Sequence, residues 1–329
     1  MKHATSIAGL GLETIERLLA QAREGKREPG RKQLAGKILG MLFFNPSLRT
    51  RASFEAVMIR GGGSAIVLNA GNDSWKIEDR DGVVMDGDRA EHMKEAAPVL
   101  SRYVDALGLR TFAAGIDDDQ DHADGVIRAF EKYATVPVIS MESAREHPCQ
   151  GLADLLTIEE QFGPAKGVPV ALIWAPHIKP LPKAVPNSFL LTAAARGCEI
   201  RVAHPPGFDL HSAIISEARQ YAAATGGSIS FGEDQAAAVG GARAVYAKAW
   251  GPATAAGLPP TAVKQHGGWM ITPELMSRAA KDAIFLHCLP VRRNVEVADG
   301  VLDGEWSRVI DQAENRFHVQ RALLEWLLN

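Results

Sequence analysis

Two arginines and two hydroxyl side chains lie close together in the segment Ser-Leu-Arg-Thr-Arg, residues 47–51. An apolar run at residues 37–44 predicts a buried strand, and Asn-Pro-Ser breaks it, so we expect a helix to begin with Ser47 as its N-cap. A helix start presents unpaired backbone N–H groups and the positive end of the helix dipole. Since Arg49 and Arg51 add cations to the same turn, the segment predicts a phosphate site; a capped helix with solvated arginines is the alternative.

The rest of the chain alternates short apolar runs with amphipathic stretches. This alternation predicts an α/β fold of two doubly wound units, each a mostly parallel sheet covered on both faces by helices. Ligands in such sheets bind beyond the carboxyl ends of the strands, which is where the polar residues of interest fall. The expected strands are residues 37–44, 65–68, 104–109, 136–141, 168–175, 199–203, 228–231, 244–247 and 283–289.

A long polar connection follows the second expected strand. It covers residues 69–88 and contains Trp75, an indole with no evident reason to lie in a polar loop unless it finds apolar cover. Long loops in compact domains are often functional, so we expect this one to contribute to a site. A helix is expected next at residues 90–103, bent or shortened by Pro98.

Length and composition exclude several classes of protein. The chain has 329 residues, enough for two domains, and its net charge of -3 argues against a general nucleic-acid binder. No apolar run is long enough to span a membrane, and the first residues lack the core of a signal peptide. The three cysteines, Cys149, Cys198 and Cys288, show neither paired nor metal-type spacing, so we expect a cytoplasmic protein without a metal site.

Three motifs resemble one enzyme family. Ser-x-Arg-Thr-Arg after a strand resembles the carbamoyl-phosphate signature of the aspartate and ornithine carbamoyltransferases. His147-Pro148-Cys149-Gln150 and His287-Cys288-Leu289-Pro290 match two further motifs of that family in the same order. The sequence between them is similar to the N-acylornithine branch, whose members act on N-acetyl- or N-succinylornithine in arginine biosynthesis. The resemblance runs from about residue 35 to the C-terminus and implies no metal or organic cofactor.

The resemblance implies which residues bind carbamoyl phosphate. Phosphate contacts fall on Ser47, the Leu48 backbone, Arg49, Thr50 and Arg110. It implies that the carbamoyl group is contacted by His147, Gln150, Arg316 and the backbone at Cys288 and Leu289. It also implies that Trp75 reaches the site from a neighbouring subunit. Attack by an amine builds negative charge on the carbonyl oxygen, so cations and N–H donors are the groups that the chemistry needs.

Each of these residues also has a simpler interpretation when it is taken alone. His147 could begin a helix, Arg110 could be a surface charge at a strand end, and Arg316 could be an ordinary helix arginine. His287 with Cys288 could indicate a metal site or a covalent Cys–His pair, but further ligands are not evident and direct attack on carbamoyl phosphate needs no covalent intermediate. Cys288 is therefore interpreted as lining a pocket.

The second substrate is inferred from the segment that stands where the aspartate and ordinary ornithine branches of the family have their substrate-binding loops. The segment 246–251, Tyr-Ala-Lys-Ala-Trp-Gly, resembles the Lys-x-Trp segment of the N-acylornithine branch, and its Lys248 could pair with an α-carboxylate. An acylated nitrogen needs no carboxylate partner, whereas a free α-ammonium does. The residues expected around the acceptor are Ala90, Phe112, Glu142, His177, Lys179, Lys248, Cys288, Leu289 and Glu296.

Two of these positions depart from the acetylornithine enzymes. Those enzymes have a glutamate where Ala90 stands, and a succinyl carboxylate would be repelled by it, so Ala90 favours succinyl as the acyl group. Lys179 could pair with that carboxylate, whereas Glu91 could replace the missing glutamate if the loop shifts by one residue. Residues 313–320 resemble the acetyl enzymes more closely. Glu296 stands where they have a carboxylatable lysine; it could supply a negative charge or be an exposed residue without a role.

The resemblance also implies an organisation for the whole chain. It implies a carbamoyl-phosphate domain at residues 1–141, joined by a C-terminal helix at 312–329, and an acceptor domain at 142–311. It further implies a trefoil knot, in which residues 236–250 pass through the proline-rich loop 176–186, and a homotrimer with shared active sites. A non-catalytic homologue is the second hypothesis. A dinucleotide-dependent oxidoreductase is the third, although no G-x-G-x-x-G follows the first strand.

Overall fold

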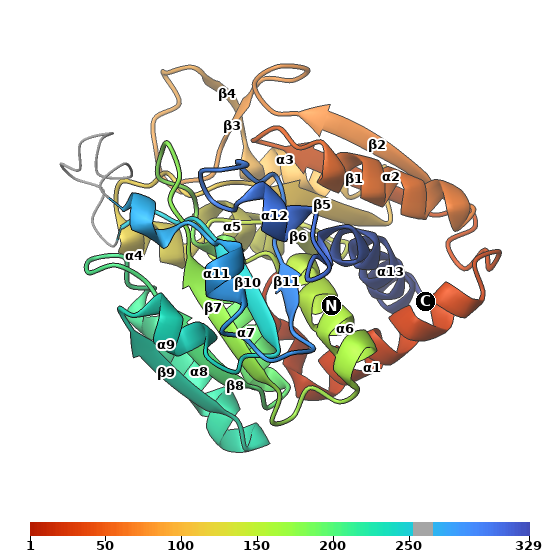
Figure 1. Ribbon diagram of the computed structural model, residues 1–329. Helices are drawn as coiled ribbons and strands as arrows, with labels where there is room; N and C mark the ends of the chain where they lie inside the picture. Colours follow the sequence, from red (N-terminus) through yellow and green to blue (C-terminus); the bar gives the residue numbers. More distant parts are fainter. Residues whose placement is uncertain (253–265) are drawn as a thin grey trace. The chain divides into compact units, whose positions relative to one another are not determined.

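The computed structural model describes residues 1–252 and 266–329 and divides into two compact units. Unit 1 comprises residues 1–113, 123–149 and 316–329, and unit 2 comprises the described part of 114–122 and 150–315. Each unit is built on a parallel sheet with helices, which confirms the predicted fold class (Figure 1). The predicted domain boundaries and the knot stay predictions. None of the described helices combines the length and apolar character that crossing a membrane requires.

The main sheet of unit 1 has four parallel strands in the order β2-β1-β5-β6. The register sets Phe43 beside Arg110 and Arg110 beside Glu142, so the carboxyl ends of β1, β5 and β6 lie next to one another. This edge is the switch point of the strand order, where open α/β sheets bind ligands. The strands are β1 (Ile38–Phe43), β2 (Ser64–Asn69), β5 (Ala106–Arg110) and β6 (Val138–Glu142), with helices α1 (Ile7–Arg27), α2 (Arg49–Arg60), α3 (Met93–Leu100) and α5 (Gly125–Tyr133).

The long polar connection of unit 1 holds a second, small parallel pair. β3 (Lys76–Glu78) pairs with β4 (Arg89–His92), and Ala90 is the extra residue of a bulge because Arg89 and Glu91 face consecutive residues of β3. The helix expected from residue 90 therefore begins only at Met93. The His92 side chain accepts the Lys94 N–H at 3.1 Å and caps that helix, a signal that apolar periodicity does not show.

Unit 2 has a five-stranded parallel sheet in the order β11-β10-β7-β8-β9. Lys248 ends β10 beside Trp174 at the end of β7, which is again the switch point of the sheet. The strands are β7 (Pro169–Trp174), β8 (Glu199–Ala203), β9 (Ser228–Gly232), β10 (Ala244–Lys248) and β11 (Ile284–Leu286). The helices are α4 (Asp118–Ala123), α6 (Pro148–Phe162), α7 (Ala184–Ala195), α8 (Ser212–Thr225), α9 (Gln235–Val239), η1 (Gly267–Trp269), α11 (Pro273–Met276) and α12 (Asp299–Leu302).

The last helix, α13 (Val309–Leu328), contributes residues to both units. Its residues up to Asn315 belong to unit 2, and those from Arg316 onward belong to unit 1. Within unit 1 the Arg321 guanidinium donates to the carbonyls of Glu28 and Arg31 at 3.2 and 2.9 Å. These bonds hold the helix against the end of α1, in agreement with the predicted packing of the C-terminal helix.

Candidate functional site

The turn that leads into α2 carries the predicted phosphate residues. The Ser47 hydroxyl accepts the Thr50 N–H at 3.2 Å, so Ser47 supplies the expected capping bond although Leu48 is the residue that directly precedes the helix. Leu48 is exposed and Arg49 is half-buried. The short break after β1 thus delivers a hydroxyl, backbone N–H groups and a guanidinium to the switch point of the unit 1 sheet.

Thr50 is the centre of a buried polar cluster in unit 1. Its hydroxyl oxygen accepts from Arg110 Nη1 at 3.3 Å and from Arg316 Nη2 at 2.8 Å. All three side chains are buried, and the Nε atoms of both arginines have no hydrogen-bond partner among the described residues. Two guanidinium groups that share one neutral acceptor form a strong anion site, because their charges repel each other unless negative charge is present.

Glu142 supplies part of that negative charge. The Arg110 Nη1 atom donates to its Oε2 atom, and His147 Nε2 lies 3.9 Å from the same oxygen. The Phe112 ring lies 4.5 Å from the Arg110 guanidinium and stacks a negative ring face on the cation. Glu142 was predicted on the acceptor side; the structure sets its carboxylate within the arginine cluster of unit 1.

His147 is a neutral imidazole in this cluster. Burial, and then the charges of Arg316 and Arg110, hold its pKa well below the ordinary value. Burial also lowers the pKa of Arg316. A neutral imidazole can donate one N–H to a carbonyl oxygen without adding a further charge. The turn before it is fixed by Glu146, whose Oε2 accepts the Ile7 N–H at 2.7 Å.

In unit 2, His177 and Glu296 lie together near the carboxyl ends of the strands. Arg292 Nε donates to His177 Nε2 at 3.1 Å, so the ring proton is on Nδ1, which donates to the Lys179 carbonyl at 2.9 Å. Burial lowers the pKa of His177, and this agrees with a neutral ring. Glu296 Oε1 lies 3.6 Å from His177 Nε2.

Glu296 is buried, so the interpretation of this residue as an exposed one is wrong. The Leu289 N–H donates to His287 Nδ1 at 3.0 Å, which leaves the ring proton on Nε2 to donate to Glu296 Oε2 at 3.0 Å. Burial raises the pKa of the Glu296 carboxyl, but the bond from His287 and the nearby Lys248 outweigh it, so the pKa is lowered. A carboxylate thus fixes, through one imidazole, the backbone of Leu289, which has a φ of 56°.

Two buried residues of unit 2 were missed by sequence reasoning. Asp154 Oδ1 accepts from Gln150 Nε2 at 2.7 Å and from Gln312 Nε2 at 2.6 Å. Gln312 Oε1 in turn accepts the His287 N–H at 2.9 Å. The i,i+4 spacing of Gln150 and Asp154 on α6 was a usable signal. No sequence signal indicates the bond between Asp154 and Gln312, because the two residues are 158 positions apart in the chain.

The remaining predicted residues are less buried. Trp75 and Ala90 are exposed in the β3–β4 region of unit 1, where the Trp75 indole N–H donates to Glu91. In unit 2, Lys179 is exposed and Cys288 is half-buried. The structure therefore gathers the predicted buried cations and imidazoles into one cluster in each unit, and among the described residues Lys179 joins the unit 2 cluster only through its backbone.

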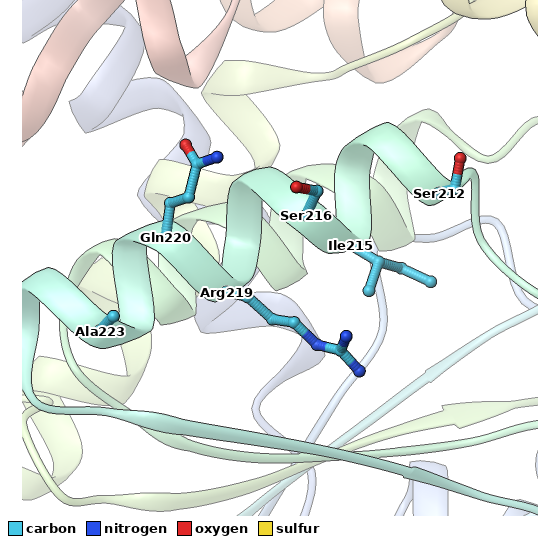
Figure 2. Close-up of a pocket in the computed structure, with 6 residues that line it drawn as sticks. All are labelled: Ser212, Ile215, Ser216, Arg219, Gln220 and Ala223. Atoms are coloured by element: carbon cyan, nitrogen blue, oxygen red, sulfur yellow. The ribbon is translucent and has the colours of Figure 1, made fainter.

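The two clusters are distinct from a metal site and from the hollow on α8. No group of three or more His, Cys, Asp or Glu side chains in residues 1–252 and 266–329 is arranged to hold a metal ion. A shallow hollow runs along one face of α8 in unit 2, and none of the predicted site residues lines it (Figure 2). Its lining consists of Ser212, Ile215, Ser216, Arg219, Gln220 and Ala223.

The sequence matches two family models that together cover most of the chain. Residues 2–160 match the model described as aspartate/ornithine carbamoyltransferase, carbamoyl-P binding domain. Residues 167–327 match the model described as aspartate/ornithine carbamoyltransferase, Asp/Orn binding domain.

Individual relatives are similar over nearly their full length. The chain is 40% identical to the N-acetylornithine carbamoyltransferase of Xanthomonas campestris, over all of this chain and 98% of the relative. It is 38% identical to the N-succinylornithine carbamoyltransferase of Bacteroides thetaiotaomicron, over 96% of this chain and 95% of the relative. A crystal structure of acetylornithine transcarbamylase complexed with acetylcitrulline has a TM-score of 0.97 and 39% identity, and all of each chain is covered.

Proposed function

The chain belongs to the aspartate/ornithine carbamoyltransferase family, and we propose that it transfers the carbamoyl group of carbamoyl phosphate to N-succinyl-L-ornithine. The observation that carries carbamoyl transfer is the buried cluster of unit 1, in which two arginines share the hydroxyl of Thr50 beside neutral His147. Such a cluster suits a small, doubly charged anion with a carbonyl group.

In the proposed reaction the δ-amine attacks the carbamoyl carbon. A C–N bond forms, the C–O bond to phosphate breaks, and the nitrogen loses a proton, which gives N-acylcitrulline and phosphate. Negative charge develops on the carbonyl oxygen and on the leaving phosphate, so fixed donors at both ends lower the barrier. We assign the phosphate to Ser47, the Leu48 backbone, Arg49, Thr50 and Arg110, and the carbamoyl group to His147, Gln150, Arg316 and the Cys288–Leu289 backbone.

The acceptor is assigned to the remaining polar residues. Lys248 would pair with the α-carboxylate, and Glu142 and His177 would contact the rest of the molecule. Buried Glu296 supports this assignment, because its carboxylate offsets the charge of Lys248 in unit 2 and holds the proton of His287 on Nε2. The other proposed contacts of the acceptor are Phe112, Lys179, Cys288 and Leu289.

Succinyl as the acyl group rests on Ala90. This residue is exposed at a bulge, a feature that turns a side chain out of the regular strand pattern. The adjacent Glu91 is paired in register with Ile77 and accepts the Trp75 N–H, so its carboxylate is already engaged. A glutamate-to-alanine variant of N-acetyl-L-ornithine transcarbamylase, 40% identical to this chain over 99% of its length with a TM-score of 0.96, is described as complexed with carbamyl phosphate and N-succinyl-L-norvaline. N-acetyl-L-ornithine is the second candidate, since relatives of both names are similarly close.

A ureido assay with carbamoyl phosphate and three amines tests both levels of the proposal. We expect turnover of N-acylornithines with a higher kcat/KM for succinyl than for acetyl, and little turnover of free L-ornithine. Ala90→Glu should shift the preference toward acetyl, whereas Ala90→Gln is the matched uncharged control. A clear wild-type preference for acetylornithine refutes the acyl assignment, and no ureido product with any of the amines refutes carbamoyl transfer.

Arg49→Ala tests the phosphate assignment. It removes a charged contact at a helix start and should cost at least ~2–3 kcal/mol of transition-state stabilisation, which is a loss of activity of about a hundredfold. Arg51→Ala is the control, because Arg51 is exposed and pairs with Glu55 at 3.5 Å. Activity of Arg49→Ala within a few-fold of wild type, with a normal circular dichroism spectrum, argues against this site.

We also propose a homotrimer with shared active sites. Trp75 is 58% exposed and Val84 is 82% exposed, so the loop between β2 and β4 offers apolar surface that a second copy would cover. Mixing inactive Arg49→Ala with inactive Trp75→Ala protein should restore part of the activity. A monomer by light scattering, or no recovery after verified subunit exchange, refutes sharing.

A further inference from the structure

We propose that Asp154 is a positioning residue that turns the Gln150 amide so that its oxygen accepts from the carbamoyl NH2 group, which lets the protein distinguish carbamoyl phosphate from acyl phosphates. The inference rests on the proposed function, since it assumes that Gln150 meets the carbamoyl group. Asp154 lies outside the three motifs described above.

The orientation of the Gln150 amide follows from the chemistry of its neighbour. An ionised carboxylate only accepts hydrogen bonds, so the group that lies 2.7 Å from Asp154 Oδ1 is the Gln150 NH2. The amide oxygen therefore has to point away from the carboxylate. Without Asp154, either end of the amide could meet a ligand, because the two ends have nearly the same shape.

Gln312 gives an independent check that Asp154 Oδ1 is a hydrogen-bond acceptor. The backbone N–H of His287 is a donor, so the Gln312 atom at 2.9 Å from it is the oxygen. The Gln312 NH2 then faces Asp154 Oδ1 at 2.6 Å. Two NH2 groups thus donate to one carboxylate oxygen, an arrangement that a neutral amide oxygen would support less strongly.

The oxygen of Gln150 is left as an unused acceptor. Gln150 is 1% exposed, and its Oε1 has no hydrogen-bond partner in residues 1–252 and 266–329. A buried acceptor without a donor is unfavourable, so this atom favours a ligand that brings an N–H group. Carbamoyl phosphate brings an NH2, whereas acetyl phosphate has a methyl group of similar size at the same place.

The helix that carries both residues is held firmly. A Cβ atom added at Gly151 would lie 2.8 Å from the Ser188 carbonyl oxygen and 2.9 Å from a Thr192 methyl carbon, so α6 packs closely against α7 at this point. Asp154 itself is completely buried. Gln150 and Asp154 are one helical turn apart on this helix, and their bond is therefore fixed by the backbone as well as by charge.

The test uses two stable phosphonates that differ only in the group that would contact the Gln150 amide oxygen. Phosphonoacetamide carries the NH2, and acetonylphosphonate carries a methyl group in its place. Inhibition constants are measured for both, and for inorganic phosphate, in wild type and in Asp154→Asn. The variant keeps the volume of the side chain but can donate to Gln150, so the amide is free to reverse.

We expect the wild type to bind phosphonoacetamide about tenfold more tightly than acetonylphosphonate, and Asp154→Asn to lose that ratio while its inhibition by phosphate changes less than twofold. Gln150→Met should lose the ratio as well, and adding Asp154→Asn to it should change the ratio no further. Gln312→Leu is the matched control, because it disturbs the same network but leaves Asp154 bonded to Gln150; its ratio should stay. An unchanged ratio in Asp154→Asn, or an equal loss for all three inhibitors, overturns the proposal.

A second measurement covers the case in which Asp154→Asn does not fold. The side-chain NH2 signals of Gln150, assigned by their loss in Gln150→Met, should stay protected from hydrogen exchange when wild type binds phosphonoacetamide. Loss of that protection means that the NH2 has left Asp154 and overturns the inference. A wild type without ureido activity is a separate result, which counts against the proposed function.

Discussion

Asp124 is a buried carboxyl whose titration should be visible in the stability of the protein. It precedes α5 with a φ of 55°, and it accepts hydrogen bonds from the Ser143 hydroxyl and the Ala144 N–H. Burial raises its pKa from 3.8 to about 6, and the two bonds and nearby arginines offset only part of this effect. The residues that it contacts lie in the turn that ends at His147.

The sign of the effect follows from the two pKa values. At pH 8 the carboxyl is ionised in both states, and the charge is unfavourable in the buried folded state. Below about pH 6 the folded state takes up a proton that the unfolded state binds only near 3.8, so this group's contribution to stability improves as the pH falls from about 7 to 4. The difference between the two pKa values corresponds to about 3 kcal/mol.

Asp124→Asn removes the charge and keeps an oxygen for both donors, and asparagine tolerates the left-handed backbone. We expect the variant to be more stable than wild type by about 2–3 kcal/mol at pH 8, and the difference to fall below about 1 kcal/mol at pH 4.5. The assay is urea unfolding of both proteins at the two pH values and fixed ionic strength.

Asp282→Asn is the control with the opposite sign. Asp282 is exposed, and its bond from Arg243 lowers the pKa of the carboxyl, so its stabilising effect is present at pH 8 and fades as the pH falls. A difference between Asp124→Asn and wild type that does not change between pH 8 and 4.5 refutes the reasoning, because it means that the Asp124 carboxyl titrates alike in both states.

Two further substitutions test how the sites are built. Glu296→Leu leaves the buried His287 Nε2–H without its acceptor and should lower the free energy of unfolding by about 2–3 kcal/mol. Glu296→Gln keeps an oxygen at this place, so it should lower the free energy of unfolding by under about 1 kcal/mol. Urea midpoints distinguish the two variants, and equal losses contradict the bond. Gly151→Ala should lower the melting temperature through about 1–3 kcal/mol of overpacking against Ser188 and Thr192, and an unchanged melting temperature contradicts the close packing of α6.

The regular part of the fold could be predicted because its signals are local. The apolar run at residues 168–175 became β7 (Pro169–Trp174), and its neighbours in unit 2 were found in the same way. The pair β3–β4 was missed because residues 76–78 and 89–92 are short and polar, so their pairing depends on contacts across the loop. The helix expected from residue 90 began at Met93 for the same reason.

The candidate site could be predicted where a motif is continuous and not where its parts are distant. Residues 47–50 follow a strand and begin a helix, so their phosphate-binding role could be predicted from one continuous segment. The partnership of Arg110 with Glu142 follows from strand register, which the order of strands determines and the sequence does not state. The Asp154–Gln312 bond joins two helices far apart in the chain, and no periodicity marks it.

The position of α13 has a consequence for the order of synthesis. This helix follows every other described element in the chain, yet it supplies Arg316 to the arginine cluster of unit 1 and Gln312 to the buried amide network of unit 2. While these residues are still inside the ribosome, neither polar cluster of the nascent chain is complete. Affinity for carbamoyl phosphate should therefore arise only after α13 has left the ribosome, and a chain stalled before Val309 should lack it.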